Sequence, residues 1–97
     1  MRLRFTARAF RDLEDISDYI RTHSPRTATR VSTAILESLD ALTAFPAIGR
    51  RQSVAGVRKL VTKRYRYLAY YRIDEAADEV IILTVQHSAR ERQFDDV

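Results

Sequence analysis

Residues 57–86 read VRKLVTKRYRYLAYYRIDEAADEVIILTVQ, and the alternation of apolar and polar side chains along them decides the fold. A period of two is typical of half-buried strands, and it predicts strands at residues 57–61, 65–73 and 80–86. The acidic segment at residues 74–79, DEAADE, separates the last two of these strands and predicts a hairpin turn. Both faces of VIILTV are apolar, so we expect this last strand to be central and covered on both sides.

Upstream of these strands the apolar residues recur every three or four positions, which predicts helices at residues 7–21 and 25–45. Thr6 offers a cap for the first helix, while Ser24 followed by Pro25 is a start signal for the second. Pro46 disfavours helical geometry in the residue before it, so the second helix ends near Phe45. Two helices joined by a short loop form an antiparallel hairpin.

A short alternating segment at residues 2–5 adds an N-terminal strand. The order β-α-α-β-β-β predicts one α+β domain over residues 1–97, in which the helical hairpin packs on one face of a small, twisted, mainly antiparallel sheet. The segment PAIGRRQSVAG, residues 46–56, predicts an irregular connection. On residues 65–73 we expect the side bearing Arg66, Leu68, Tyr70 and Arg72 to be open, so that Leu68 and Tyr70 leave apolar surface for a partner.

Composition narrows the class of protein. A chain of 97 residues suits a single domain. The absence of cysteine excludes a disulfide framework and a thiol nucleophile, and two histidines 64 residues apart give no metal-ligand cluster, so we expect neither metal nor cofactor. Because the charged N-terminal sequence lacks a signal-peptide pattern and no window resembles a membrane span, we expect a cytoplasmic protein without membrane contact.

Charge is strongly segregated along the chain, whose net charge is +4. The stretch from Gly49 to Arg72 holds four of the five tyrosines and no carboxylate, and it contains eight basic residues: Arg50, Arg51, Arg58, Lys59, Lys63, Arg64, Arg66 and Arg72. Such segregation predicts a polyanionic or acidic partner. Tyrosine and arginine are also enriched at protein-docking surfaces, and tyrosine is an ordinary strand residue, so nucleic acid, protein and purely structural roles all stay open.

A metal-independent ribonuclease is one chemistry that these residues could support. It needs a general base, a general acid and cations for the phosphate. His87 could transfer protons, Tyr65 or Tyr67 could stack or donate a proton, and phosphate could be held by Arg66, Arg72 or Arg90. The basic stretch from Gly49 to Arg72 contains no carboxylate that could act as the base, which argues against a ribonuclease. A histidine at the end of a strand can equally serve only a structural hydrogen bond.

The ordered set of segments resembles the RelE/ParE superfamily of toxins from bacterial type II toxin–antitoxin modules. Four pieces carry the resemblance: ARAFRDLEDISDYI, PAIGR, GVRKL, and RYRYLAYYRI followed by VIILTVQHSAR. The resemblance implies a helical hairpin on a small sheet, a cytoplasmic bacterial protein, and a cognate antitoxin, acidic and similar to ParD, that wraps the toxin. It implies no sequence-specific DNA binding by this chain alone.

Two branches of the superfamily imply different targets. ParE-like members are associated with inhibition of DNA gyrase, and the long hairpin, the PAIGR turn and the YLAYYR strand look more like this branch. RelE-like members are ribosome-dependent mRNA endonucleases; Arg66 stands where many ParE-like chains carry proline, whereas Phe94 stands roughly where a tail tyrosine might complete a nuclease site. We favour the ParE-like, non-enzymatic reading, with RelE-like mRNA cleavage as the alternative.

These readings assign candidate residues to three roles. For antitoxin binding the candidates are Leu68, Tyr70 and Arg72. The ribonuclease alternative would use Arg66, Tyr67, His87 and Arg90. For target binding the candidates are Arg50, Arg58, Arg64, Arg66, Arg72 and Arg90.

Overall fold

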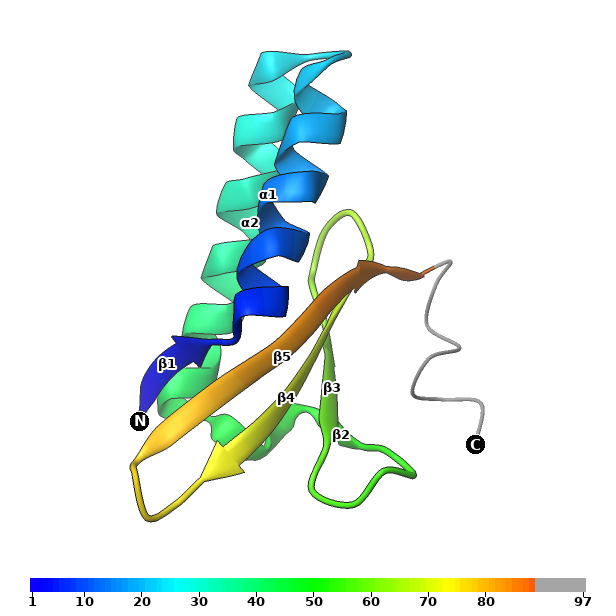
Figure 1. Cartoon of the computed structure of the whole chain (residues 1–97). Helices are drawn as coiled ribbons and strands as arrows, with labels where there is room; N and C mark the ends of the chain where they lie inside the picture. The colour runs from blue at the N-terminus through cyan, green and yellow to red at the C-terminus, as the bar shows by residue number, and fades with distance from the viewer. Residues whose placement is uncertain (89–97) are drawn as a thin grey trace.

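The computed structural model describes residues 1–88 of the chain. Its elements, in chain order, are β1 (Arg2–Phe5), α1 (Ala7–Arg21), α2 (Pro25–Ala44), the short 3-10 helix η1 (Pro46–Ile48), β2 (Arg50–Arg51), β3 (Arg58–Val61), β4 (Tyr67–Asp74) and β5 (Glu79–His87) (Figure 1). The predicted order of strand, two helices and three strands is confirmed. Two short elements are added, because the connection predicted to be irregular contains the 3-10 helix η1 and the two-residue strand β2.

The strands form one mixed sheet in the order β1-β5-β4-β3-β2. β1 pairs in parallel with β5, and every other neighbouring pair is antiparallel. β5 therefore lies between two strands, and its residues Val80, Ile81 and Ile82 are all buried. The prediction of a strand covered on both faces is confirmed.

The two helices begin where local sequence signals place them. Thr6 accepts a hydrogen bond from the amide of Ala9 at 3.0 Å, and Ser24 accepts one from the amide of Thr27 at 3.2 Å. Pro25 occupies the start of α2, where its missing N–H costs nothing. The resulting hairpin packs on one face of the sheet and extends well beyond it (Figure 1). No helix among residues 1–88 has the length and apolar character needed to cross a membrane.

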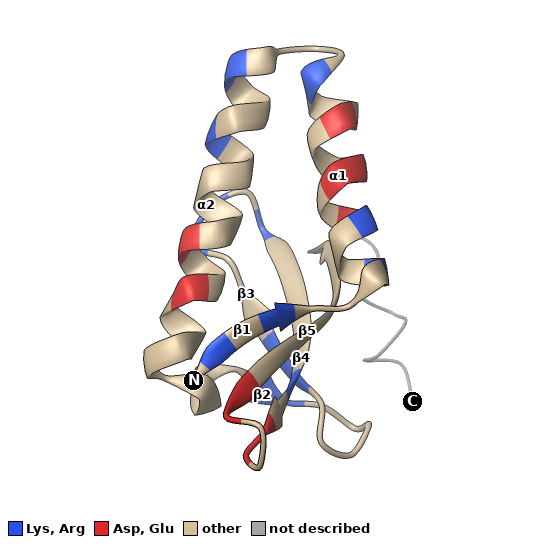
Figure 2. Cartoon of the chain, turned by 60° about the vertical axis from the view of Figure 1, so that its left-hand side comes forward, with Lys and Arg blue, Asp and Glu red and all other residues tan. Residues whose placement is uncertain are grey.

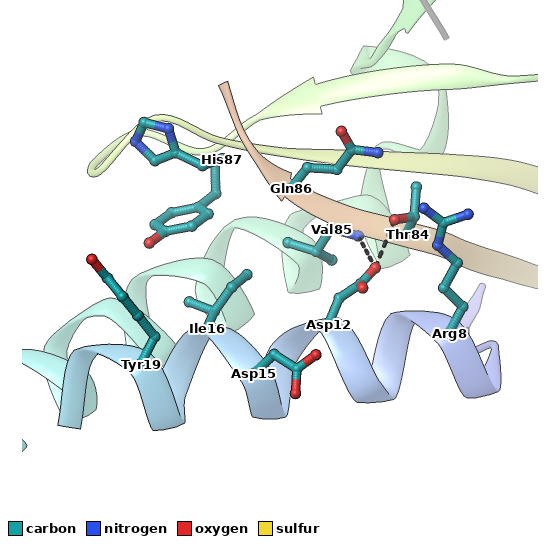
Figure 3. A pocket seen from close by; sticks show the side chains of 10 residues that line it. Arg8, Asp12, Asp15, Ile16, Tyr19, Thr84, Val85, Gln86 and His87 are labelled. Carbon is teal, nitrogen blue, oxygen red and sulfur yellow. Dashed lines mark hydrogen bonds between the residues drawn. The ribbon is translucent and has the colours of Figure 1, made fainter. Parts of the chain in front are cut away.

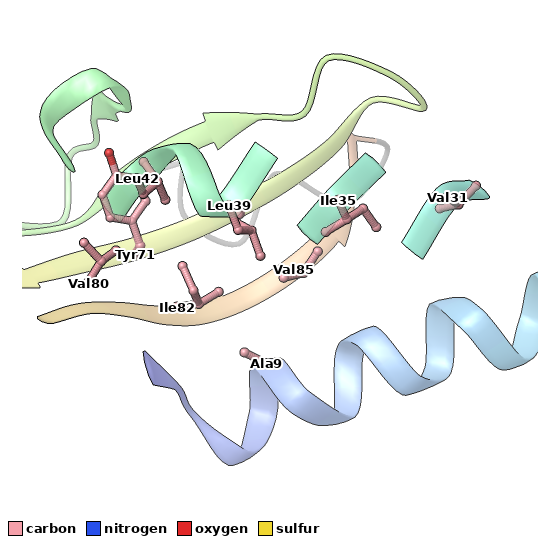
Figure 4. Packing of buried hydrophobic residues seen from close by; sticks show 10 residues of the cluster. Ala9, Val31, Ile35, Leu39, Leu42, Tyr71, Val80, Ile82 and Val85 are labelled. Atoms are coloured by element: carbon pink, nitrogen blue, oxygen red, sulfur yellow. The ribbon is translucent and has the colours of Figure 1, made fainter. Parts of the chain in front are cut away.

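The main core lies between this hairpin and the sheet. Figure 4 shows the buried stripe of α2 facing the central strands. The members of this cluster are Ala9, Val31, Ile35, Leu39, Leu42, Ala69, Tyr71, Val80, Ile82 and Val85. Burial of each large apolar side chain contributes about 1.5–3 kcal/mol, so the stripe at helical spacing fixes which face of α2 meets the sheet.

The opposite face of the sheet differs from the expectation. Leu68 and Tyr70 do not leave apolar surface, since they are 3% and 0% exposed and pack with Val57 and the half-buried Leu83. Val57 lies in the loop before β3, where its carbonyl accepts a hydrogen bond from the amide of Gln52. The loop thus closes on itself and brings an apolar side chain to this face. The open face expected around Leu68 and Tyr70 is therefore a second, small core.

The turn between β3 and β4 also differs from the expected strand at residues 65–73. Tyr65 and Arg66 adopt left-handed backbone conformations, with φ of 66° and 49°, so β4 begins only at Tyr67. Left-handed geometry is incompatible with strand pairing. The β4–β5 turn lies where the acidic residues predict it, between Asp74 and Glu79.

Candidate interaction site

The exposed end of the β3–β4 hairpin concentrates cations in a rigid turn. The Thr62 hydroxyl donates to the carbonyl of Arg64 at 2.7 Å and accepts from the amide of Tyr67 at 3.1 Å. The carbonyl of Arg66 accepts from the amide of Ser88 at 3.1 Å. These bonds hold residues 63–66, KRYR, which are all exposed; we call them the hairpin tip.

Backbone strain at this tip is a second unusual feature. For residues other than glycine, a left-handed conformation costs about 1–2 kcal/mol each, and it persists only where surrounding contacts over-determine it. Tyr65 and Arg66 are consecutive residues of this kind. The bonds made by Thr62 and Ser88 supply the necessary constraint, so the tip presents its side chains from a fixed backbone.

A second set of predicted cations lies on the sheet face opposite the helices. Strand register places Arg50 opposite Lys59 and Lys59 opposite Tyr70. Because side chains alternate along a strand, Arg72 shares the face of Tyr70. Figure 2 shows the carboxylates mainly on α1, α2 and the β4–β5 turn, whereas basic residues lie around β2 and β3 and also on β1 and both helices. The region around β2 and β3 is thus basic, while the helices carry both signs of charge.

Arg58 is separated from these cations and is engaged within the fold. It lies opposite Tyr71, on the helix-facing side. Its Nη1 donates to the carbonyl of Ala47 at 3.2 Å and to that of Gly49 at 2.8 Å. Arg58 therefore holds η1 and the following residue against β3, whereas the other described candidates for target binding, Arg50, Arg64, Arg66 and Arg72, are exposed.

The candidates for proton transfer meet at the end of β5. Tyr67 and His87 are cross-strand partners, and their rings make an edge-on contact with centroids 5.3 Å apart. Tyr67 packs against the main core, so this pair lies on the helix-facing side. Burial raises the pKa of Tyr67, which keeps its hydroxyl protonated at neutral pH and makes it a poor base. Arg90 lies outside the described residues.

A groove of about 560 Å³ runs beside this pair, between α1 and β5. Figure 3 shows Asp12 and Tyr19 extending from α1 toward the strand, with Asp15 beside the helix. Asp12 accepts hydrogen bonds from the Thr84 hydroxyl at 2.6 Å and from the Val85 amide at 3.0 Å. Its carboxylate thus joins α1 to the sheet.

Sequence reasoning missed Asp12, because helical spacing places it on the polar side of α1. No local signal marks its partners, which are 72 and 73 residues away.

The two faces of the sheet carry different predicted groups. His87 and Tyr67 lie on the helix-facing side, in a groove that Arg8 also lines, whereas Arg50 and Arg72 lie on the opposite side. Of the predicted ribonuclease residues, the structure brings together Tyr67 and His87, and places the backbone of Arg66 next to the end of β5. Among residues 1–88, no group of histidine, aspartate and glutamate side chains could hold a metal ion.

Comparison with known proteins connects this architecture to a family. Residues 3–92 match the model of the ParE toxin of the type II toxin–antitoxin system parDE. The chain belongs to the ParE toxin family. It is therefore a toxin component of a type II toxin–antitoxin system, within the RelE/ParE superfamily that the sequence resembles.

Three relatives show how far the likeness extends. The chain is 40% identical to "Putative toxin Y4kP" of Sinorhizobium fredii over 90% of this chain and 88% of that protein. It is 35% identical to the toxin RelE2 of Caulobacter vibrioides over 89% of this chain and 93% of that protein. The solved structure of the chromosomal ParDE system from P. aeruginosa includes a chain 31% identical, with a TM-score of 0.77 and coverage of 90% and 95% of the two chains. ParE and RelE names thus both occur among its relatives.

Proposed function

We propose that this ParE-family toxin inhibits growth by binding DNA gyrase in the bacterial cytoplasm, without catalysis, and that an acidic, ParD-like antitoxin neutralises it. The observation that carries the proposal is the hairpin tip, in which Lys63, Arg64 and Arg66 project from a strained, hydrogen-bonded turn. A fixed cationic surface favours binding to an acidic protein surface, since the side chains are already held apart and oriented.

The position of Arg72, on the opposite face of the sheet from Tyr67 and His87, also supports a non-catalytic mode of action. General acid–base catalysis requires the proton donor or acceptor within hydrogen-bond reach of the reacting atom, with cations at the same phosphate. His87 shares a face with Tyr67 and α1, whereas Arg72 is on the other side of the sheet. Asp12 is engaged by Thr84 and Val85. This arrangement of side chains favours binding to a target protein over cleavage of RNA.

Gyrase supercoiling with the purified toxin tests this proposal. The wild type should inhibit supercoiling, and Arg64→Ala with Arg66→Ala should weaken inhibition by about tenfold, because two exposed charges are lost from the contact. Arg11→Ala with Arg26→Ala removes two exposed helix cations as a matched control and should inhibit like the wild type. Full supercoiling activity at saturating wild-type toxin would exclude gyrase as the target.

Ribosome-dependent mRNA cleavage is the second candidate, favoured by the contact between Tyr67 and His87. In this reading His87 transfers protons and Arg66, with Arg90, binds phosphate. Mapping of mRNA 5′ ends after induction of the toxin distinguishes the two targets. New ends that disappear in His87→Ala would establish cleavage, whereas unchanged transcripts during growth arrest support the gyrase proposal.

A further inference from the structure

Basic residues from four strands meet on the face of the sheet opposite the helices. Arg50, Lys59 and Arg72 lie on this face. Strand β1 extends the set, because Arg4 lies opposite Ile81 on one side of β5 and Arg72 lies opposite it on the other. The neighbours of Arg4 in β1 pack against the main core, so Arg4 points away from the helices. We call this set the basic face: Arg4, Arg50, Lys59 and Arg72.

The basic face is long rather than compact. It runs across the whole sheet from β1 to β2, which are four strand spacings apart, or about 19 Å. One strand of a DNA duplex carries a negative charge about every 3.4 Å, so a backbone lying along this path passes about five phosphates. Four long cationic side chains distributed over that length suit an extended polyanion better than a single small anion.

The apolar side chains of this face are buried beneath its surface. Leu68, Tyr70 and Ile81 are 3%, 0% and 2% exposed. Protein interfaces usually have an apolar or aromatic centre and are poor in lysine. At these positions the face offers cations without such a centre, and the planar fork of arginine matches the geometry of phosphate. Nucleic acid backbone is therefore a better complement to this face than a protein surface.

Negative charge on this face is confined to its edge at the β4–β5 turn. Asp74 and Glu79 lie opposite each other there. Glu79 forms an ion pair with Nε of Arg4 at 3.2 Å, which uses one of the five N–H donors of the guanidinium. Arg50 and Lys59 lie at the other side of the sheet, on β2 and β3. The face thus becomes more basic toward β2 and β3.

We propose that the basic face binds the phosphate backbone of double-stranded DNA, without reading its sequence, in the DNA segment that gyrase holds. This inference rests on the proposed function and adds a second surface to it, with the hairpin tip on gyrase and the basic face on DNA. Strand β3 connects the two surfaces, since it carries Lys59 and leads into the tip. Two contacts made by one rigid molecule act together, so the toxin binds the gyrase–DNA complex more tightly than gyrase alone.

Binding of DNA by the wild-type toxin without gyrase is the first test. Fluorescence anisotropy with a labelled duplex of about 20 base pairs, two helical turns, measures the affinity. With about four phosphate contacts, the affinity should fall by about a hundredfold between about 50 and 200 mM salt. An affinity that does not depend on salt, or no binding at about 50 mM salt, would overturn the proposal.

A pair of double variants locates the contact. Arg50→Gln with Arg72→Gln should weaken binding to the duplex by about tenfold or more and should reduce the salt slope by about two. Arg11→Gln with Arg26→Gln is the matched control, because it removes the same charge from exposed positions on the helices. The control should bind within about twofold of the wild type. Equal losses in the two double variants would overturn the basic face as the site.

Single-stranded RNA of the same length distinguishes the nucleic acids. The duplex should bind more tightly than the RNA, and the reverse order would overturn the assignment to DNA.

Capture of gyrase on immobilised toxin tests the joint contact. Addition of linear DNA should raise the affinity of the wild type for gyrase by about tenfold. Arg50→Gln with Arg72→Gln should bind gyrase alone like the wild type but should show no gain with DNA. Equal binding of the wild type to gyrase with and without DNA would overturn the joint contact. A toxin that binds DNA through the basic face but does not bind gyrase refutes the proposed target and retains the basic face.

Discussion

The hydroxyl of Tyr71 and the amide of Gly49 join two segments 22 residues apart by a buried hydrogen bond of 2.8 Å. The same hydroxyl donates to the carbonyl of Pro46 at 2.7 Å, so one side chain of β4 fixes both ends of the PAIG segment. Arg58 holds the segment from β3 through the carbonyls of Ala47 and Gly49. η1 is thereby held against β3 and β4 by two side chains.

Tyr71→Phe should lower the free energy of unfolding by about 1–3 kcal/mol, because the Gly49 amide and the Pro46 carbonyl lose their partner while the ring still fills the core. Urea unfolding followed by circular dichroism measures the change, with an unaltered m-value expected. Tyr65→Phe removes a hydroxyl from a more exposed tyrosine and should change stability by less than about 0.5 kcal/mol. Equal stability of Tyr71→Phe and the wild type would show that the two bonds contribute nothing net.

Gly49→Ala should destabilise the fold through a collision with the Tyr71 side chain, since a Cβ at this position would lie against the hydroxyl and the ring. Overpacking of this kind costs about 1–3 kcal/mol. The φ of Gly49 is −70°, so the cost does not come from backbone strain. In a Tyr71→Phe background the same change should cost less, because part of the obstruction is gone; strictly additive free energies of unfolding would refute this mechanism.

Alkaline pH should destabilise the protein through Tyr71. Burial raises its pKa above the usual 10.0, although the hydrogen bond from Gly49 and the charge of Arg58 act in the opposite direction. A raised folded-state pKa means that the stabilising contribution is complete below the unfolded-state pKa and is lost as the pH rises through the folded-state value.

Urea unfolding as a function of pH measures this effect. Wild-type stability should fall above about pH 10. Tyr71→Phe should fall less steeply, because it lacks one of the two tyrosines, Tyr67 and Tyr71, whose pKa burial raises. Parallel profiles for the two proteins would contradict a role for Tyr71.

Asp12→Ala should destabilise the junction between α1 and β5 by about 1–3 kcal/mol, because the Thr84 hydroxyl and the Val85 amide lose their acceptor. Asp15→Ala is the matched control, since Asp15 is exposed on the same helix. Its effect should remain within about 0.5 kcal/mol. Thermal unfolding of the two variants compares them directly, and similar melting temperatures would show that the Asp12 contacts are dispensable.

Local features of the fold could be predicted, whereas features that depend on distant contacts could not. The caps at Thr6 and Ser24 act within three residues, so their sequence signals suffice. Burial of Leu68 and Tyr70 depends instead on Val57, which a loop returns to the sheet face. Alternation identifies the two faces of β4, but it does not reveal which loop covers one of them.

In the candidate site too, local features could be predicted from the sequence, whereas features that depend on distant contacts could not. The concentration of cations was evident from the sequence, but strand register and turn geometry decide where each cation lies. Arg58 turns toward η1, and the left-handed conformation of Arg66 removes it from β4. Neither result follows from the spacing of residues. The contacts of Arg58 depend on the Ala47 and Gly49 carbonyls that the fold brings near it. The conformation of Arg66 depends on the hydrogen bonds that hold the turn.

Strain at the hairpin tip yields a variant in which stability and function should change in opposite directions. Arg66→Gly relieves a left-handed conformation, so the free energy of unfolding should rise by about 1 kcal/mol. Loss of the cation should at the same time weaken gyrase inhibition. Asp78→Gly is the matched control, because Asp78 has a φ of 56° in the β4–β5 turn. It should show the same gain in stability with unchanged inhibition. If Arg66→Gly were more stable and fully inhibitory, the strain at the tip would have no connection with target binding.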